Sequence, residues 1–308
     1  MMGLPTSKAG WIEYGWGVVN VGVKEAPVME RAEIARNLAD VLDDPNWSPP
    51  VLPEVAAKLI ETTRNPNASV ADVANILKRD PTLAAQLLRR ANSAVYAAKI
   101  KAQTVNEAAV RMGFHGVRNL ALEIALSMRV FRSEGYQPIA DALRRHSVAS
   151  AYLSAMVGRY ARINAEESFL CGLLADMGLA VGLMVLGERT RGYKRPDLSL
   201  VWPSLMEIHE ELSARMATRW NLAPETAQVL ANHHRLSIEG EVHPMIAVVM
   251  VSNGLAEKLG VHFPTPPDAT TVPMANLEKE ARAWLGLTDR HIELLLVEGR
   301  KHLTELSR

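Results

Sequence analysis

The sequence is poor in the residues that mark secreted, membrane-spanning and nucleic-acid-binding proteins. Its 308 residues include a single cysteine, Cys171, which excludes a disulfide framework and a zinc site built from several thiolates. Cys171 stands in an apolar run and is predicted to be a core residue. Lys plus Arg equals Asp plus Glu at 34 each, so no overall positive charge attracts nucleic acid or an anionic membrane.

Targeting and strand signals are also scarce. The first residues show no charged segment followed by an apolar one, and no later segment holds about 18 uninterrupted apolar residues. We therefore expect a cytoplasmic protein that neither is exported nor spans a membrane. Aromatic residues make up only 5% of the chain, and strand-forming patterns are rare. With 48% hydrophobic residues, the chain can still bury a full core.

What the sequence does contain is helical periodicity. From Pro27 onward, apolar residues recur three and four positions apart, which predicts roughly a dozen helices and an all-α fold. Capping boxes and prolines predict where helices begin, and glycines predict where two of them end. These signals are Ser69 with Asp72, Thr104 with Glu107, Asn164 with Glu167, Pro81, Pro203, Pro224, Pro244, Gly113 and Gly260.

The segment WIEYGWGVVNVGV, residues 11–23, differs from everything after it. Its aromatic and β-branched residues partly alternate, which predicts a short strand or hairpin arm. Because a lone two-stranded ribbon is marginal in water, we expect the arm to pack on the helical body or on the same arm of a second copy. The apolar side chains concerned are Trp11, Tyr14, Trp16, Val18, Val19, Val21 and Val23.

One carboxylate stands in an unusual place. In CGLLADMGLAVG, residues 171–182, Asp176 is surrounded by apolar residues and has no cation within four positions. A buried, unpaired carboxylate costs roughly several kcal/mol, so such a residue normally has a metal ion, a histidine or several hydrogen-bond donors as its partner. The rest of the chain must supply that partner.

Candidate partners for Asp176 stand on other predicted helices. They are His146, His209, the pair His233-His234, and Asn253. Imidazoles and carboxylates that converge from several helices suit a divalent metal that activates water. A lone histidine on a helix is more often a satisfied core or surface residue, however, and spacing alone leaves both interpretations open.

Motifs in both halves of the chain resemble a known bacterial family. In the first half these are Leu52-Pro53, Asp80-Pro81-Thr82-Leu83 and Asn92-Ser93. Further on, His146-Ser147, Gly172-Leu173-Leu174, His209, Trp220 and His233-His234 follow in matching order. In order and spacing the set resembles the HDOD domain, the HD-related output domain, over roughly residues 48–300. The resemblance implies an HD-domain-like multi-helix bundle with an N-terminal helical lobe, preceded here by a short β arm.

Two departures from the family pattern decide what the resemblance implies about activity. Catalytic HD-superfamily phosphohydrolases bind metal through an adjacent His-Asp pair and a later Asp. Here the pair reads Ala175-Asp176 and the later position is Asn253. HDOD proteins commonly show such losses and are taken as regulatory modules, so the resemblance implies signalling without catalysis. It also places Asp176 in the former metal pocket, where a histidine proton replaces the charge of the metal.

These considerations lead to expectations about ligands and partners. We expect a vestigial HD pocket without metal or cofactor, a protein partner in signal transduction, and gating by a nucleotide or cyclic dinucleotide. The paired arginines 89–90 and 144–145 are predicted to be solvated, not bound to nucleic acid. Two alternatives stay open: a phosphohydrolase or phosphodiesterase that uses a reduced ligand set, and a sensor whose pocket binds a nucleotide without turnover. The reduced ligand set is His146, Asp176, His209 and His233 or His234.

The predicted organisation has three parts. Residues 1–47 form the arm and a leading helix, residues 48–300 the HDOD domain, and residues 301–308 a C-terminal tail. Within the HDOD domain, an N-terminal helical lobe spans residues 48–131 and a degenerate HD-like lobe spans residues 138–300. The turn-rich segments 132–138 and 262–273 mark breaks in the helical pattern.

Overall fold

The chain folds almost entirely into helices, as its periodicity predicts. The computed structural model describes residues 11–14, 17–20, 31–44, 50, 53–65, 67–93, 96, 100–127, 130–191, 194–262, 265 and 274–306. The helices before the turn at residues 132–136 are α1 (Arg31–Asp43), α2 (Glu54–Arg64), α3 (Val70–Leu77), α4 (Pro81–Ala91) and α5 (Val105–Ser127). Those after it are α6 (Gln137–Ala161), α7 (Ala165–Leu174), α8 (Met177–Arg189), α9 (Leu198–Arg219), α10 (Pro224–Leu230), α11 (Pro244–Lys258), α12 (Met274–Trp284) and α13 (Asp289–Leu306).

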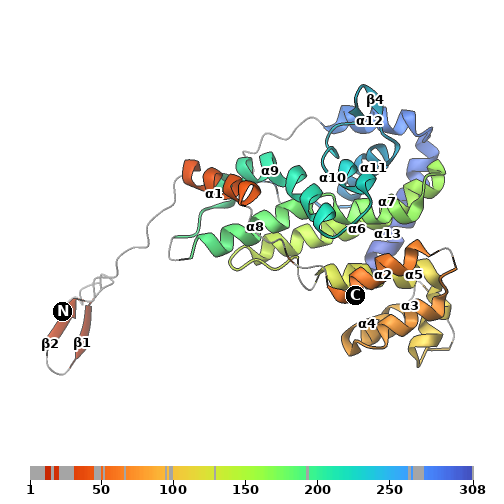
Figure 1. The fold of residues 1–308 in the computed structure, drawn as a ribbon, viewed down its shortest axis with the longest axis horizontal. Coiled ribbons are helices and arrows are strands. Elements are labelled where there is room, and N and C mark those ends of the chain that lie inside the picture. The colour runs from red at the N-terminus through yellow and green to blue at the C-terminus, as the bar shows by residue number, and fades with distance from the viewer. Residues whose placement is uncertain are drawn as a thin grey trace, which may run out of the picture.

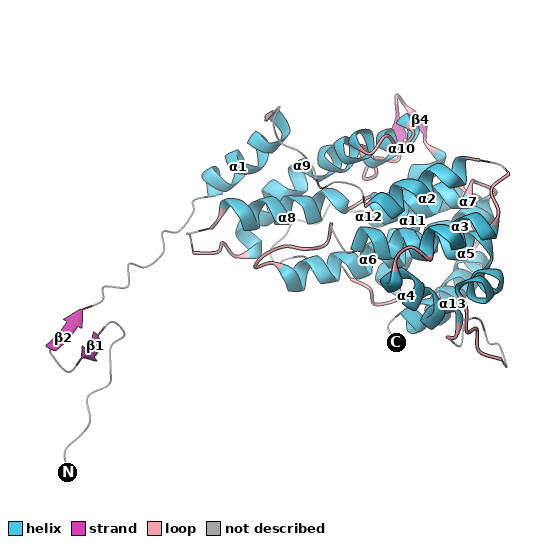
Figure 2. Cartoon of the chain, turned by 60° about the horizontal axis from the view of Figure 1, so that its bottom comes forward, coloured by secondary structure: helices cyan, strands magenta, loops and turns pink. Residues whose placement is uncertain are grey.

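Two small hairpins supply the strands that the structure describes. Near the N-terminus, β1 (Trp11–Tyr14) pairs antiparallel with β2 (Gly17–Asn20), which confirms the predicted arm. A second hairpin pairs β3 (Ser237–Ile238) with β4 (Glu241–Val242). Figures 1 and 2 show β1 and β2 apart from the helices, so packing of the arm on its own chain is not seen. Its packing on a second copy stays a prediction, and residues 16, 21 and 23 lie outside the described residues.

Most of the predicted capping signals are found where the sequence places them. Ser69 and Asp72 form a reciprocal capping box at α3, and Pro81, Pro224 and Pro244 each open a helix. The prediction for Pro203 is wrong, because Pro203 lies inside α9. The helix already begins at Leu198, so Pro203 lies past its first turn and removes the hydrogen bond that an N–H at this position would donate to the carbonyl of Ser199.

The two predicted glycine ends have different outcomes. Gly260 follows α11 with a φ of +80°, as a C-terminal cap requires. Gly113 has a φ of +71° and marks a kink, after which α5 continues in a new direction. Only the first segment of α5 therefore ends at Gly113.

The helices form two lobes around one apolar core. In the N-terminal lobe, α5 packs against α2, α3 and α4. In the second lobe, α6 packs against α7, α11 and α13, while α8 and α10 pack against α9. The leading helix α1 packs against α8 and α9 at the end of the body opposite α3 and α4 (Figure 1). Helix α13 continues to Leu306, past residue 300, where the sequence predicts a tail to begin.

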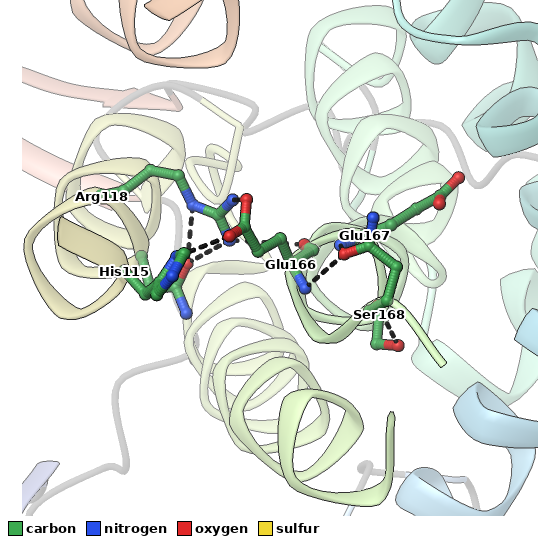
Figure 3. Close-up of polar contacts among 7 residues, drawn as sticks. His115, Arg118, Glu166, Glu167 and Ser168 are labelled. Atoms are coloured by element: carbon green, nitrogen blue, oxygen red, sulfur yellow. Dashed lines mark hydrogen bonds and ion pairs between the residues drawn. The ribbon is translucent and has the colours of Figure 1, made fainter. Parts of the chain in front are cut away.

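A partly buried ion pair joins the two lobes. Arg118 on α5 is 4% exposed, and its Nη1 lies 2.6 Å from Oε2 of Glu166 in the first turn of α7. The same guanidinium donates to Oδ1 of Asn119, and Nδ1 of the exposed His115 lies 2.6 Å from Oε1 of Glu166. Figure 3 shows Arg118 and His115 reaching Glu166 from the same side. We call Arg118, Asn119, His115 and Glu166 the lobe clamp.

By length and composition, the stretch Ala165–Arg189 is apolar enough to cross a membrane, but 89% of its apolar window is buried inside the fold. It comprises α7 and α8, which pack in the second lobe (Figure 2). This burial is typical of a core segment of a globular domain.

Candidate functional site

The tertiary structure brings Asp176 and four of the predicted histidines together, although they come from distant segments. Asp176 is the residue between α7 and α8, where it occupies the N-cap position of α8 without capping it. His146 lies on α6, His209 on α9, and His233 and His234 directly after α10. We call these five residues the histidine cluster.

The cluster is enclosed in the second lobe. Exposed fractions are 4% for His146, 7% for Asp176, and 1% each for His209 and His233, while His234 is half-buried. Oδ1 of Asp176 lies 3.5 Å from Nε2 of His233, and Oδ2 lies 3.7 Å from Nε2 of His146. These separations are those of ion pairs and are longer than typical hydrogen bonds.

Backbone carbonyls orient three of the imidazoles. Nδ1 of His209 lies 2.8 Å from the carbonyl of Met206, and Nδ1 of His233 lies 2.8 Å from that of Leu230. Nδ1 of His146 lies 3.1 Å from the carbonyl of Val261. Because a carbonyl only accepts, each Nδ1 carries a proton, and each Nε2 faces the interior of the cluster.

The fourth imidazole, that of His234, forms a hydrogen bond with His209. Nε2 of His209 and Nε2 of His234 are 2.9 Å apart. Since the Nδ1 proton of His209 is already donated, its Nε2 accepts and that of His234 donates. Nε2 of His233 is buried and has no hydrogen-bond partner among the described residues, so its main neighbour is the carboxylate of Asp176.

The charges in the cluster follow from this geometry. Burial acts to raise the pKa of Asp176, but the approach of His233, and then of His146, holds it well below its usual range. Burial acts to lower the pKa of His233, but Asp176 raises it above its ordinary value. Aspartate and imidazolium therefore stabilise each other's charged forms.

Two further imidazoles, those of His209 and His234, are held neutral. Burial, followed by repulsion from His233, lowers the pKa of His209 to about 4. The same two causes, with a contribution from His209, lower the pKa of His234 to about 3. At neutral pH the cluster thus contains the carboxylate of Asp176 and neutral rings at His209 and His234, while Asp176 favours the charged form of the His233 ring.

Close packing between α8 and α9 places His209 beside Asp176. A Cβ added to Gly178 would lie 2.0 Å from the backbone oxygen of His209, so only glycine permits this approach. Ser213, one turn further along α9, accepts from the N–H of Gly178 at 2.8 Å and donates to the carbonyl of Ala175 at 2.8 Å. These contacts fix the start of α8 against α9.

The two departures from the family pattern lie at defined places. Ala175 is fully buried, and its methyl side chain offers no ligand atom. Asn253 on α11 accepts at Oδ1 from the hydroxyl of Ser150 on α6, at 2.6 Å. Its carboxamide is therefore engaged in contacts between helices.

The donor set that remains fits one divalent metal ion. Asp176, His209, His233 and His234 each present a ligand atom, and these atoms lie within 4.8 Å of one another. Three imidazoles and a carboxylate suit zinc and similar ions, and a carbonyl that accepts from Nδ1 commonly orients a metal-binding imidazole. The unpartnered Nε2 of His233 agrees with this fit.

The motif residues of the first lobe have structural roles. Asp80 caps α4 by accepting from the N–H groups of Thr82 and Leu83, and the side chain of Leu83 is buried. Asn92 ends α4, and its amide group bonds both the N–H and the carbonyl of Ala102. These contacts hold the loop between α4 and α5. The motif residues Pro81, Ser93 and Pro53 stand at helix ends, and Leu52 lies outside the described residues.

Several other residues are buried in the core. Cys171 is buried, and burial raises the pKa of its thiol, which makes it unreactive. Trp220 donates from Nε1 to the carbonyl of Pro50 at 2.9 Å. Met245 and Met250 are buried in the core.

Reasoning from the sequence missed Arg118 and Glu123, two buried charges on α5. Glu123 accepts at Oε2 from the hydroxyl of Tyr152 at 3.0 Å, and its Oε1 lies 3.4 Å from Nη2 of Arg90. The signal was present in GVRNLALEIAL, residues 116–126, where two charges interrupt an apolar run. This is the same signal that singled out Asp176.

Comparison with known proteins identifies the family. The sequence model of the HDOD domain family matches residues 50–236, which is more than half of the chain. The chain therefore belongs to the HDOD domain family, a branch of the HD superfamily. An uncharacterized protein of Treponema pallidum (strain Nichols) is 26% identical over 239 residues, which cover 73% of this chain and 44% of that protein. The chain thus spans less than half of this relative.

Solved structures show the same fold. A structure described as "Putative metal-dependent phosphohydrolase", from Shewanella amazonensis SB2B, has a TM-score of 0.67 at 18% identity and covers 89% of this chain and 97% of its own. A "Putative signal transduction protein" from Marinobacter aquaeolei VT8 has a TM-score of 0.60 at 21% identity, covering 94% and 68%. At these identities the likeness establishes the helical architecture.

Proposed function

We propose that the chain is a non-catalytic HDOD module of signal transduction that acts through contacts with a protein partner. The enclosure of the histidine cluster carries this proposal. A phosphoester can be hydrolysed only where it reaches the reacting groups, and His146, Asp176, His209 and His233 are 1–7% exposed. The cluster is then a charge centre that stabilises the second lobe.

The missing ligands support the same conclusion. A two-metal mechanism stabilises both the attacking and the leaving oxygen, which requires ligands for two ions. Ala175 offers none, and the carboxamide of Asn253 is bonded to Ser150. The imidazolium of His233 can balance Asp176 in place of a metal ion, which is the role that the family resemblance implies for a histidine of this pocket.

The similar Marinobacter protein, described as acting in signal transduction, agrees with a regulatory role. A cytoplasmic location is part of the proposal, because regulatory contacts of this kind require access to intracellular partners. Gating by a nucleotide is also proposed. Because four of the five cluster residues are at most 7% exposed, we place this ligand elsewhere on the molecule.

An assay of hydrolysis tests the proposal. The purified full chain, supplied with Mn²⁺, Mg²⁺ or Zn²⁺, is incubated with bis(p-nitrophenyl) phosphate and with a cyclic dinucleotide. We expect the parent to release no more product than the His209→Ala variant. Metal-dependent release that disappears in His209→Ala would refute the absence of catalysis.

Restoring ligands gives a second test. The double variant Ala175→His with Asn253→Asp supplies the two donors that the family pattern lacks. We expect it to bind more Mn²⁺ per chain than the parent in calorimetry, with Asn253→Asp alone as the control. Equal stoichiometry in all three proteins would show that the loss of these ligands is not what limits metal binding.

A metal-dependent phosphohydrolase is the second candidate function, and one observation favours it. Asp176, His209, His233 and His234 keep a four-donor set whose ligand atoms lie within 4.8 Å of one another. A bound divalent ion would supply an activated water and a polarised phosphoryl oxygen. The similar Shewanella structure is described as a phosphohydrolase of this kind. Metal content measured on the purified chain, together with the hydrolysis assay, separates the two functions.

A further inference from the structure

A cavity lies where the two lobes meet, outside the histidine cluster. Its volume is about 270 Å³, and its walls come from α4, α5, the loop before α6, and α6 itself. Ile124 and Phe131 form its apolar part, and both are buried. Gln137, Asp141 and Arg144 contribute from successive turns along one face of α6.

Most polar groups of this cavity are already satisfied by the fold. Gln137 donates from Nε2 to the carbonyl of Phe131 and to Oδ1 of Asp141, both at 3.1 Å. Ser127 donates to the carbonyl of Glu123 at 2.6 Å, and the carboxylate of Glu123 is held by Tyr152 and Arg90. These groups shape the cavity and keep little capacity to bind a ligand.

Two guanidinium groups are different. Arg132 and Arg144 line the cavity, yet neither forms a hydrogen bond or ion pair with any residue that the structure describes. Each offers five N–H donors in a planar fork, which matches the oxygens of a phosphate. The cavity also opens beside the first turns of α6, where the helix dipole favours negative charge.

The rest of the lining narrows the class of ligand. Two unpaired guanidiniums favour a dianion, and a phosphate monoester has enough terminal oxygens to meet both forks. Asp141 would repel the phosphate, but its second oxygen can accept from a hydroxyl group of the ligand. The volume lies just below the roughly 300 Å³ at which ligand pockets usually begin, so the organic part must be compact.

From these contacts we infer that the cavity between α5 and α6 binds a phosphorylated sugar no larger than a nucleoside monophosphate, with its phosphate on Arg132 and Arg144. A hydroxyl group of the sugar faces Asp141, and its apolar surface faces Phe131. This inference extends the proposed function, because it gives the nucleotide gate a place outside the enclosed cluster. It excludes a cyclic dinucleotide from this cavity on grounds of size. Binding can be measured without reference to catalysis.

The experiment uses the full chain and defined probes. Adenosine 5′-monophosphate, ribose 5-phosphate, inorganic phosphate, adenosine and a cyclic dinucleotide are compared by thermal shift and calorimetry. We expect the two phosphorylated sugars to bind and to raise the melting temperature, and adenosine and the cyclic dinucleotide to leave it unchanged. Absence of binding by both phosphorylated sugars would overturn the inference.

Matched variants locate the binding site. Arg144→Gln should weaken binding roughly tenfold or more, and Arg132→Gln should also weaken it, because each removes a charged donor. The control is Arg145→Gln, which changes an exposed arginine of α6 that does not line the cavity. Equal losses in Arg144→Gln and Arg145→Gln would show a diffuse charge effect and would refute a site in the cavity.

Binding in the cavity and hydrolysis at the histidine cluster can be measured separately on the same samples. The same samples are checked for release of phosphate from adenosine 5′-monophosphate. Release that is lost in His209→Ala but kept in Arg144→Gln would refute the absence of catalysis and leave the binding result unaffected. Binding that is unchanged in both Arg132→Gln and Arg144→Gln would refute the cavity site whether or not phosphate is released.

Discussion

Charged side chains have close partners on one side of α6, whereas Arg144 on the other side lacks a hydrogen-bond partner among the residues that the structure describes. On one side, His146 faces a cluster in which buried charges and rings are matched to one another. Two residues earlier along the helix, Arg144 faces a hollow and has no bonded partner among the described residues. Residues two apart on a helix point in nearly opposite directions, so one element serves both regions. The difference teaches that a buried charge whose neighbours satisfy it marks structure, whereas a partly exposed guanidinium that lines a cavity without a hydrogen bond is a candidate for binding.

The largest expected loss of stability comes from substitution of Asp176 in the histidine cluster. Asp176→Ala leaves the imidazolium of His233 buried without its partner, so the free energy of unfolding should fall by about 2 to 5 kcal/mol. Urea denaturation of the variant and the parent measures this loss. Asp176→Asn, which keeps the size of the side chain, separates the loss of charge from the loss of packing. A variant as stable as the parent would show that the cluster contributes nothing to the fold.

Acid should lower the free energy of unfolding through the histidine cluster. In the folded chain the pKa values of His209 and His234 are lowered to about 4 and 3. As the pH falls, both rings therefore take up a proton in the unfolded chain near the ordinary histidine pKa, but stay neutral in the folded chain. Stability should therefore fall between pH 6.5 and 4, by roughly 2 to 4 kcal/mol for the pair at pH 5. The raised pKa of His233 acts the other way, since its contribution is complete at low pH and is lost as pH rises.

Denaturation at pH 7, 6 and 5 tests this dependence. In His209→Gln, the loss between pH 7 and pH 5 should be less steep than in the parent, because one of the groups that take up a proton only on unfolding is removed. His302→Gln should reduce the slope by a similar amount, because the pKa of His302 is also lowered to about 4, and it shows the effect of one such group outside the cluster. Identical slopes in His209→Gln and the parent would assign the acid sensitivity to other groups.

The lobe clamp should show an intermediate effect. Glu166→Gln leaves the guanidinium of Arg118 buried beside a neutral acceptor, so we expect a loss of about 1 to 3 kcal/mol. His115→Ala, which removes the exposed member of the clamp, should cost less than about 1 kcal/mol. Chemical denaturation compares the two variants. Equal losses would mean that the buried pair gives no more than a surface contact.

A substitution at the cavity should change the stability far less than one in the histidine cluster. Asp141 is only partly buried, and its recorded contact is a hydrogen bond from Gln137 one turn away, so Asp141→Asn should change stability by less than about 0.5 kcal/mol. Set beside Asp176→Asn, it compares the same substitution on the two sides of α6. A loss as large as that of Asp176→Asn would remove the contrast between the two regions.

The arm should have the smallest effect on the stability of the body. Because β1 and β2 lie apart from the helices, deleting residues 1–26 should leave urea denaturation unchanged. If the arm pairs with a second copy, light scattering should show a dimer that becomes a monomer on deletion. A destabilised monomer would instead indicate that the arm packs on its own chain, and no change in mass or stability would refute both.

Much of the fold follows from the sequence because its signals are local. Periodicity three and four residues apart, the box at Ser69 and Asp72, and the prolines at 81, 224 and 244 act within one helical turn, so they predict helices and their starts without knowledge of the fold. Pro203 shows the limit of such signals. This proline lies past the first turn of α9, which begins at Leu198, so a proline by itself does not show where a helix begins.

The sequence by itself also determined that Asp176 needed a partner, because an apolar run cannot leave a carboxylate unpaired. Only the tertiary structure decided which imidazoles meet it, which atoms face inward, and that Gly178 lets α9 approach. The ion pair of Arg118 and the position of Arg132 and Arg144 at the cavity also follow only from the tertiary structure. The physical reason is that pairing and desolvation depend on contacts between segments tens of residues apart, whereas periodicity and caps depend on neighbours in the chain.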